Sequence, residues 1–425
     1  MQSSEQYHRR SLIGASIPRS GHHYLARILN FYFGNEIHYC EWYGPPDCCR
    51  QVPCTRPGAY RAVYQKSHDW DFSLTQSVRD ALYLVQFRQP VPEALSDRDL
   101  LQDSFGSPSL NYRLTREYYG WWLATKAVYY RKFHEKWIRN PLPNAVHLDY
   151  DALLLRPEES IAPIVQWVSG SVDSERLSKA IAQASPSRDA GDGAPVFTPR
   201  VIERSRHFDR DLLAPFEAYV LQHCPLFGFK PELSGSYEGH WLYGLILAQD
   251  QDEPLPPGET DRLDAAARRA PGHPEIVMRL AKRELERNAP ERAVELLEAT
   301  LASHPYCGQA YRLMVDACKI ANRPLPACAT TSEALFACTE NPGALVEIGA
   351  VMLEDNRLAN AAAALSLAAM VQPDSFRANH LLARTLMRLG RWTQARHYAE
   401  AASALKPGNE PNKKILERIS EQLGR

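Results

Sequence analysis

The sequence predicts an α/β domain with a parallel sheet in its first half and an all-α helical solenoid in its second half. Two observations lead to this prediction. Short apolar runs alternate with helical patterns as far as about residue 235, whereas from about Gly239 onward one helical pattern follows another. The second half also repeats itself every 34 residues. The 425 residues are therefore expected to form an α/β domain over 1–235 and a helical array over 239–425.

Four strands are expected in the first half. Each is rich in Val, Ile, Leu, Tyr or Phe and is bounded by turn or polar residues, and the four runs are Ser11–Ile17, Tyr60–Gln65, Ala81–Phe87 and Ala145–Tyr150. Helical patterns follow at His22–Phe33, at about 111–140 and near Pro215–His223. This alternation predicts a three-layer domain, with helices on both faces of a parallel sheet.

The second half is expected to consist of paired helices. One position of the 34-residue grid holds Pro271, Pro305, Pro373 and Pro407, with Thr339 at the missing point, and another holds Ala293, Ala327, Ala361 and Ala395. A small residue lets the second helix of each pair approach the first, and the proline closes the unit. The pattern resembles tetratricopeptide repeats, with Glu410–Leu423 as a polar capping helix.

Composition excludes several classes of protein. The chain has 49 basic and 50 acidic side chains, so it lacks the basic excess expected for binding nucleic acid or an anionic membrane surface. No apolar run reaches the ~18 residues of a membrane span. The first residues lead into a predicted strand without the apolar core of a signal peptide. Together with nine cysteines, an odd number, this favours a cytoplasmic protein with mostly reduced thiols.

A candidate phosphate-binding loop follows the first strand. Residues 18–23 read Pro-Arg-Ser-Gly-His-His and lead directly into an apolar helix. A tight turn before a helix N-terminus directs backbone N–H groups at one point, and a basic side chain in the turn adds charge. The loop is of P-loop type without the Walker A spacing. The alternative is a plain strand–helix turn with an exposed Arg19.

Three motifs resemble those of sulfotransferases that use 3′-phosphoadenosine 5′-phosphosulfate. The loop at 18–25 is similar to the family's P-[KR]-S-G-T-T-x-L, and Arg88 to Ser96 is similar to its R-x-P-x-x-x-x-x-S. In the family, the Arg and Ser of the second motif hold the 3′-phosphate, a role that suits a guanidinium fork and a hydroxyl. The resemblance therefore implies these cofactor-binding residues: Pro18, Arg19, Ser20, Gly21, His22, His23, Arg88 and Ser96.

The third motif is Lys66-Ser67-His68, which resembles the family's K-[TS]-H segment. The resemblance implies direct sulfuryl transfer to an acceptor hydroxyl, with His68 as the general base. Lys66 and Arg19 would stabilise the charge that develops on the sulfuryl and bridging oxygens. This chemistry requires no metal. The segment 147–153 resembles a structural element of the family and adds no catalytic group.

The sequence also departs from the family pattern. His22 and His23 replace two threonines, and the family's G-x-x-G-x-W-K segment is absent. The nearest substitute is Ser187–Arg206, whose candidate charges are Arg188, Arg200, Arg204 and Arg206. An ATP-dependent P-loop phosphotransferase and an inactive scaffold, in which the repeats act alone, remain as alternatives.

Other clusters have open interpretations. Cys40, Cys48, Cys49 and Cys54, with His38 nearby, are candidates for Zn²⁺ ligands, disulfides or unreactive thiols. Two aromatic groups are candidates for an acceptor pocket or for core packing: Tyr39, Trp42 and Tyr43, and Tyr118, Tyr119, Trp121 and Trp122. The expected partners are a hydroxylated acceptor and, through the repeats, a protein or a second copy of the chain.

Overall fold

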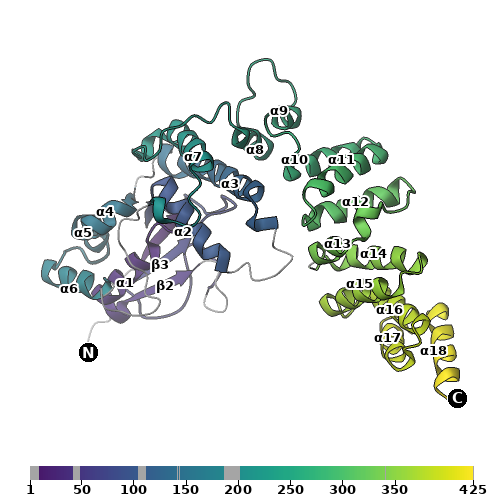
Figure 1. Ribbon diagram of the computed structural model, residues 1–425. Helices are drawn as coiled ribbons and strands as arrows, with labels where there is room; N and C mark the ends of the chain where they lie inside the picture. The colour runs from purple at the N-terminus through teal and green to yellow at the C-terminus, as the bar shows by residue number, and fades with distance from the viewer. Residues whose placement is uncertain are drawn as a thin grey trace, which may run out of the picture. The chain divides into compact units, whose positions relative to one another are not determined.

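The computed structural model describes residues 9–41, 48–103, 112–140, 142, 144–185, 202–339 and 341–424. The chain forms two compact units (Figure 1). The sheet unit comprises residues 1–101 and 123–240, and the helical unit comprises residues 102–122 and 241–425.

One segment departs from the predicted domains, because the sequence prediction assigned 102–122 to the first domain. In the structure Tyr112 lies in the apolar core of the helical unit. The carbonyl oxygen of Trp121 accepts a hydrogen bond of 3.2 Å from Gln249 in the same unit. The aromatic character of this segment, which suggested a place beside the sheet, thus reflects packing on the repeats.

The sheet unit contains five parallel strands in the order β2-β3-β1-β4-β5. Their bounds are β1 (Arg10–Ser16), β2 (Ile37–Glu41), β3 (Ala62–Ser67), β4 (Ala81–Phe87) and β5 (Ala145–Asp149). The four predicted strands are present, with ends shifted by one or two residues. The edge strand β2 was not predicted.

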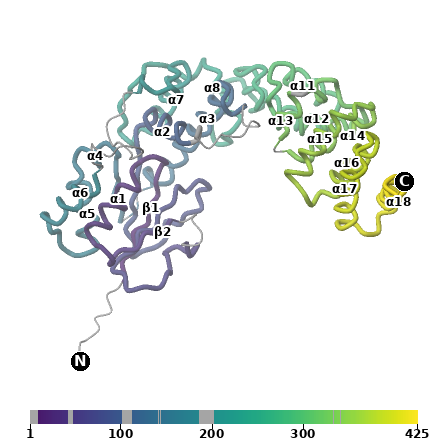
Figure 2. Tube along the Cα trace, turned by 60° about the horizontal axis from the view of Figure 1, so that its bottom comes forward, coloured from purple at the N-terminus to yellow at the C-terminus, as the bar shows by residue number. Residues whose placement is uncertain are grey.

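Helices cover both faces of this sheet. They are α1 (His22–Phe33), α2 (Pro90–Asp103), α3 (Arg116–His134), α4 (Tyr150–Leu155), α5 (Pro157–Ser169), α6 (Ser174–Ala184) and α7 (Arg210–His223). Leu82 and Leu84 of β4 share an apolar core with α1, α5 and α6, which lie together in Figure 2. Because side chains alternate along a strand, Tyr83 points to the other face, where its ring lies 5.9 Å from that of Trp137.

The helical unit follows the predicted period. Its helices are α8 (Trp241–Gln249), α9 (Arg262–Arg269), α10 (Pro274–Glu286), α11 (Pro290–Ser303), α12 (Gly308–Ile320), α13 (Ser332–Ala337), α14 (Pro342–Glu354), α15 (Leu358–Val371), α16 (Phe376–Arg388), α17 (Trp392–Leu405) and α18 (Glu410–Leu423). The helices α10, α12, α14, α16 and α18 begin 34 residues apart, which confirms the period read from the sequence. They stack in chain order into a solenoid-like array (Figure 1).

The second unit of the array is irregular. In place of a long helix after α12, the chain forms a short 3₁₀ turn (Ala327–Thr330) and then α13, a helix of six residues. This is the unit in which Thr339 stands where the other units have proline. The departure from the sequence grid therefore coincides with a departure from the helical pair.

Gly349 provides a test of helix packing in the array. A Cβ at this position of α14 would lie 2.6 Å from Cγ of Leu365 on α15. We expect Gly349→Ala to lower the free energy of unfolding by about 1–3 kcal/mol, because overpacking outweighs the better helix propensity of alanine. Gly343, near the start of the same helix, has nothing within 4 Å of its Cβ position, so Gly343→Ala is the matched control. Urea denaturation measures both variants, and equal stabilities would contradict the close approach.

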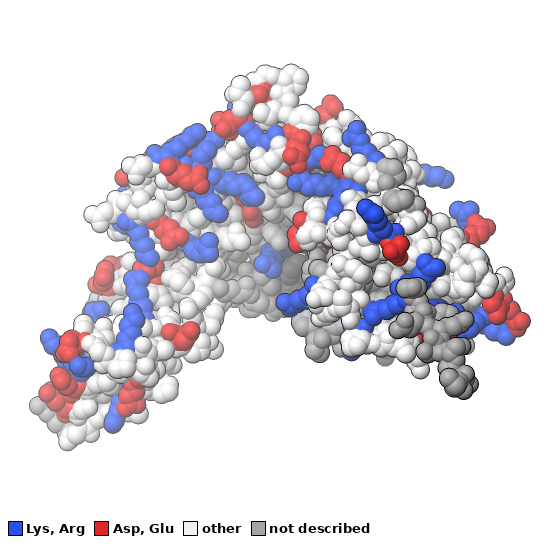
Figure 3. Space-filling model, turned by 180° about the vertical axis from the view of Figure 1, so that it is seen from behind, with Lys and Arg blue, Asp and Glu red and all other residues white. Residues whose placement is uncertain are grey.

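Charged side chains of both signs are interspersed over the face of the molecule shown in Figure 3. This matches the near balance of 49 basic and 50 acidic residues in the chain. Among the described residues, no helix combines the length and the apolar character that crossing a bilayer requires.

Candidate functional site

The loop between β1 and α1 lies at the carboxyl edge of the sheet. The turn ends in Gly21, whose φ of 83° is in the left-handed region, and α1 begins at His22. A Cβ on Gly21 would meet the ring of Tyr150 at 2.9 Å, so only glycine fits this position. Because the helix starts here, its free N–H groups and its dipole create a site for an anion.

Arg19, Ser96 and Arg88 meet on one side of this loop. The Arg19 Nε donates a hydrogen bond of 3.1 Å to the Ser96 hydroxyl on α2. Arg88, which follows β4, donates from Nη1 to the carbonyl oxygen of Arg19 at 3.2 Å. The Arg88 guanidinium also lies over the ring of Tyr150, 4.1 Å from its centroid. The two arginines and the serine predicted from separate motifs are thus brought together.

Lys66 and His68 meet on the other side of the loop. The Nδ1 of His68 lies 2.7 Å from the carbonyl oxygen of Ser16. A carbonyl oxygen only accepts, so Nδ1 carries the proton and Nε2 is the free base. The Lys66 ammonium donates to this Nε2 at 2.7 Å and to Glu41 at 3.2 Å.

Burial sets the protonation of this pair. Burial, with the charge of Lys66, lowers the pKa of His68 to about 4. Burial also lowers the pKa of Lys66 to about 8, against the opposing effect of Glu41. At neutral pH the imidazole is therefore neutral and able to accept a proton, while most of the lysine remains charged.

His22 and His23 occupy the positions of the two threonines. The ring centroid of His22 lies 4.1 Å from that of His23 and 5.1 Å from that of His68. Burial, followed by the nearby charge of Lys66, lowers the pKa of His22 strongly, so the ring is neutral at pH 7. Nitrogen atoms of His22, His23 and an oxygen of Glu41 lie within 4.8 Å of one another, close enough to reach one cation. Glu41 is, however, already paired with Lys66.

Two buried polar groups of the site have no hydrogen-bond partner within the described part of the chain. They are both ring nitrogens of His22 and the Nε of Arg88, and each side chain is only 7% exposed. An unsatisfied buried polar atom costs about 1–3 kcal/mol. The site therefore holds donors that a polar ligand at this loop would satisfy.

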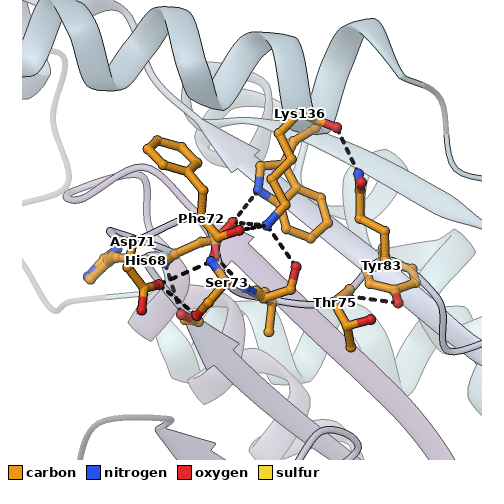
Figure 4. Close-up of polar contacts among 12 residues, drawn as sticks. His68, Asp71, Phe72, Ser73, Thr75, Tyr83 and Lys136 are labelled. Carbon is orange, nitrogen blue, oxygen red and sulfur yellow. Dashed lines mark hydrogen bonds and ion pairs between the residues drawn. The ribbon is translucent and has the colours of Figure 1, made fainter. Parts of the chain in front are cut away.

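A buried network after His68 was missed by the sequence predictions. The Asp69 carboxylate accepts hydrogen bonds from the Lys136 ammonium at 2.7 Å, the Trp137 indole at 2.8 Å and the Leu74 amide at 2.7 Å. Figure 4 shows Lys136 reaching the loop that follows His68. The network fixes the chain directly after the proposed base. The only sequence signal for it was an acidic residue next to His68.

The remaining predicted residues have diverse positions. Ser20 and Pro18 are buried in the loop, and the Ser20 hydroxyl donates to the Pro18 carbonyl at 3.4 Å. Arg206 lies 3.7 Å from Asp99, and Arg204 ends a short 3₁₀ turn. Four predicted residues lie outside the described residues: Arg188, Arg200, Trp42 and Tyr43.

The two aromatic groups are separated. The Tyr39 ring lies 5.5 Å from Tyr64 and 6.4 Å from His23, in the sheet unit. Tyr118 packs on the core of the helical unit, and Trp121 lies under the Arg279 guanidinium at 4.3 Å. The second group thus belongs to the repeats.

Comparison with known proteins gave limited information. No protein-family model and no curated protein matches the chain. Among solved structures, a MamA RS-1 ArsTM double mutant is 20% identical with a TM-score of 0.30, and it covers 35% of this chain and 83% of its own. Two further MamA structures are 18% and 19% identical, have TM-scores of 0.29 and 0.28, each cover 34% of this chain, and are themselves covered to 80% and 90%. These similarities carry no argument about function.

Proposed function

We propose that this protein is a sulfotransferase that moves a sulfuryl group from 3′-phosphoadenosine 5′-phosphosulfate to an acceptor hydroxyl. The observation that carries the proposal is the placement of two side-chain pairs on either side of the loop before α1. Arg19 and Ser96 form one pair, and Lys66 and His68 form the other. This order suits a ligand whose phosphates lie at the first pair and whose reacting sulfur lies near the second.

The donors around the loop support an anionic ligand. The loop N–H groups and Arg19 would hold the phosphosulfate end, while Arg88 and Ser96 would hold the 3′-phosphate. Both arginines are placed for charge-assisted hydrogen bonds, and His22 offers a neutral N–H donor. These few placed groups, rather than an extended basic surface, would supply the affinity.

His68 would act through its Nε2. It takes the proton of the acceptor hydroxyl while the acceptor oxygen forms a bond to sulfur and the bond from sulfur to the bridging oxygen of the phosphate breaks. The products are a sulfate ester, adenosine 3′,5′-bisphosphate and a proton on His68. The Ser16 carbonyl holds the ring through Nδ1–H and stabilises the imidazolium. Lys66 and Arg19 stabilise the negative charge on the transferring group and on the departing oxygen.

We assign the helical unit to the tetratricopeptide-like class and propose that it binds a protein partner or a second copy of the chain. The support is the 34-residue step between first helices and the small residues at the helix contacts. Arrays of this kind expose extended surfaces suited to peptides.

The titration of the site leads to a pH prediction. Transfer should fall as the pH drops through about 4, because protonated His68 cannot accept a proton. It should also fall as the pH rises through about 8, because Lys66 loses its charge. Initial rates across this range measure both limbs. Lys66→Arg, which stays charged, should remove the upper limb; a limb unchanged in that variant would exclude Lys66 as its source.

A transfer assay tests the proposed reaction. The full chain is incubated with donor labelled with sulfur-35 and with pools of hydroxylated sugars, lipids, small alcohols and tyrosine peptides. The expected result is label in at least one pool. Transfer from γ-labelled ATP instead would favour the phosphotransferase alternative, and transfer to none would favour the inactive scaffold.

A further inference from the structure

Four cysteines gather at the end of β2 in the sheet unit. The sulfur atoms of Cys40, Cys49 and Cys54 lie within 4.8 Å of one another. Cys48 is in hydrogen-bonding contact with Cys40. Cys40 and Cys54 are 1% and 7% exposed, and none of these thiols forms a disulfide in the described residues. The cluster takes no part in the proposed transfer.

The spacing of the sulfur atoms suits a tetrahedral thiolate site. With Zn–S bonds of about 2.3 Å, the sulfurs of such a site lie about 3.8 Å apart. The three grouped thiols therefore need only a small contraction to bind one ion. Cys48, beside Cys40, is in position to complete a set of four.

Backbone donors point at the same sulfurs. The N–H of Arg50 donates to Cys48 Sγ at 3.2 Å, and the N–H of Thr55 donates to Cys49 Sγ at 3.4 Å. Arg50 has a φ of 54°, a left-handed conformation in the turn that directs its N–H back to Cys48. Hydrogen bonds of this kind favour a sulfur that carries negative charge, as a metal-bound thiolate does.

We propose that Cys40, Cys48, Cys49 and Cys54 bind a structural Zn²⁺ ion. Binding replaces the thiol protons, so each cysteine that ligates releases a proton, and no oxidant is needed. The ion would fasten the segment 48–54 to β2. Because Glu41 follows Cys40 and pairs with Lys66, the ion would also hold the strand end that supports the lysine. The inference is independent of the reaction proposed above.

Metal content is the direct test. The full chain is purified under a thiol reductant without chelator, and zinc is measured by elemental analysis. We expect one zinc per chain, and exchange for Co²⁺ should give the visible bands of tetrahedral cobalt with a near-ultraviolet thiolate charge-transfer band. Absence of zinc together with failure to bind Co²⁺ would overturn the proposal, as would cysteine pairs found as disulfides under these conditions.

Variants identify the ligands. Cys54→Ser should lose most of the zinc, and Cys48→Ser should weaken the charge-transfer band. Cys224→Ser is the matched control, because Cys224 is a buried thiol of the same unit far from the cluster in sequence. Zinc retained in full by Cys54→Ser and by Cys48→Ser would contradict the site. If Cys54→Ser does not fold, the cobalt spectrum of the unchanged protein decides the question.

Discussion

Replacing His68 with alanine should reduce sulfuryl transfer by about 10²–10⁴-fold, the range expected for loss of a general base. Affinity for adenosine 3′,5′-bisphosphate should remain nearly unchanged, because the nucleotide phosphates are assigned to other groups. His68 lies between Lys66 and the Ser16 carbonyl with Nε2 as its free base. Initial rates with labelled donor and calorimetry with the bisphosphate measure the two effects separately.

Ser16→Ala is the companion variant. It removes a hydroxyl 3.2 Å from His68 Nδ1 but keeps the carbonyl that orients the ring. Transfer should therefore fall much less than in His68→Ala. Turnover retained in His68→Ala would exclude this histidine as the base, whereas lost nucleotide binding would indicate a structural role.

Replacing Arg88 with alanine should weaken binding of adenosine 3′,5′-bisphosphate by about 10–100-fold. Loss of a hydrogen bond to a charged group corresponds to about 1.5–3 kcal/mol, and about 1.4 kcal/mol is a factor of ten. Arg88 is 7% exposed and hydrogen-bonds the Arg19 carbonyl, so its removal also loosens the loop. Isothermal titration calorimetry measures the change.

The matched control for Arg88 is Arg79→Ala. Arg79 is an exposed arginine of the same unit, in the turn before β4. Its loss removes the same charge without touching the loop, so affinity should stay close to that of the unchanged protein. Equal losses in the two variants would show that the effect depends on net charge and not on the place of Arg88.

The fold was predictable where the pattern was long or repeated. The helix His22–Phe33 and the 34-residue period appear in the structure with the predicted positions. The strand Ile37–Glu41 was missed because it is short, lies at the sheet edge and mixes polar with apolar residues. The place of 112–122 was also missed, because its aromatic residues fit a core in either unit.

The site was predictable only in part, for a physical reason. Motifs identify side chains near one another in sequence, and the parallel sheet then brings Arg19, Lys66 and Arg88 to one edge. Partners supplied by distant elements carry no such signal. Glu41 beside Lys66 and Lys136 beside Asp69 could be found only from their positions in space.

The central claim is that the loop before α1 binds the nucleotide of a sulfuryl donor. The most direct measurement is calorimetric titration of the full chain with adenosine 3′,5′-bisphosphate, adenosine 5′-monophosphate and ATP. We expect the bisphosphate to bind at least about tenfold more tightly than either of the others, because Arg88 and Ser96 are placed for a 3′-phosphate. ATP binding as tightly as the bisphosphate, or no binding of the bisphosphate, would contradict the account.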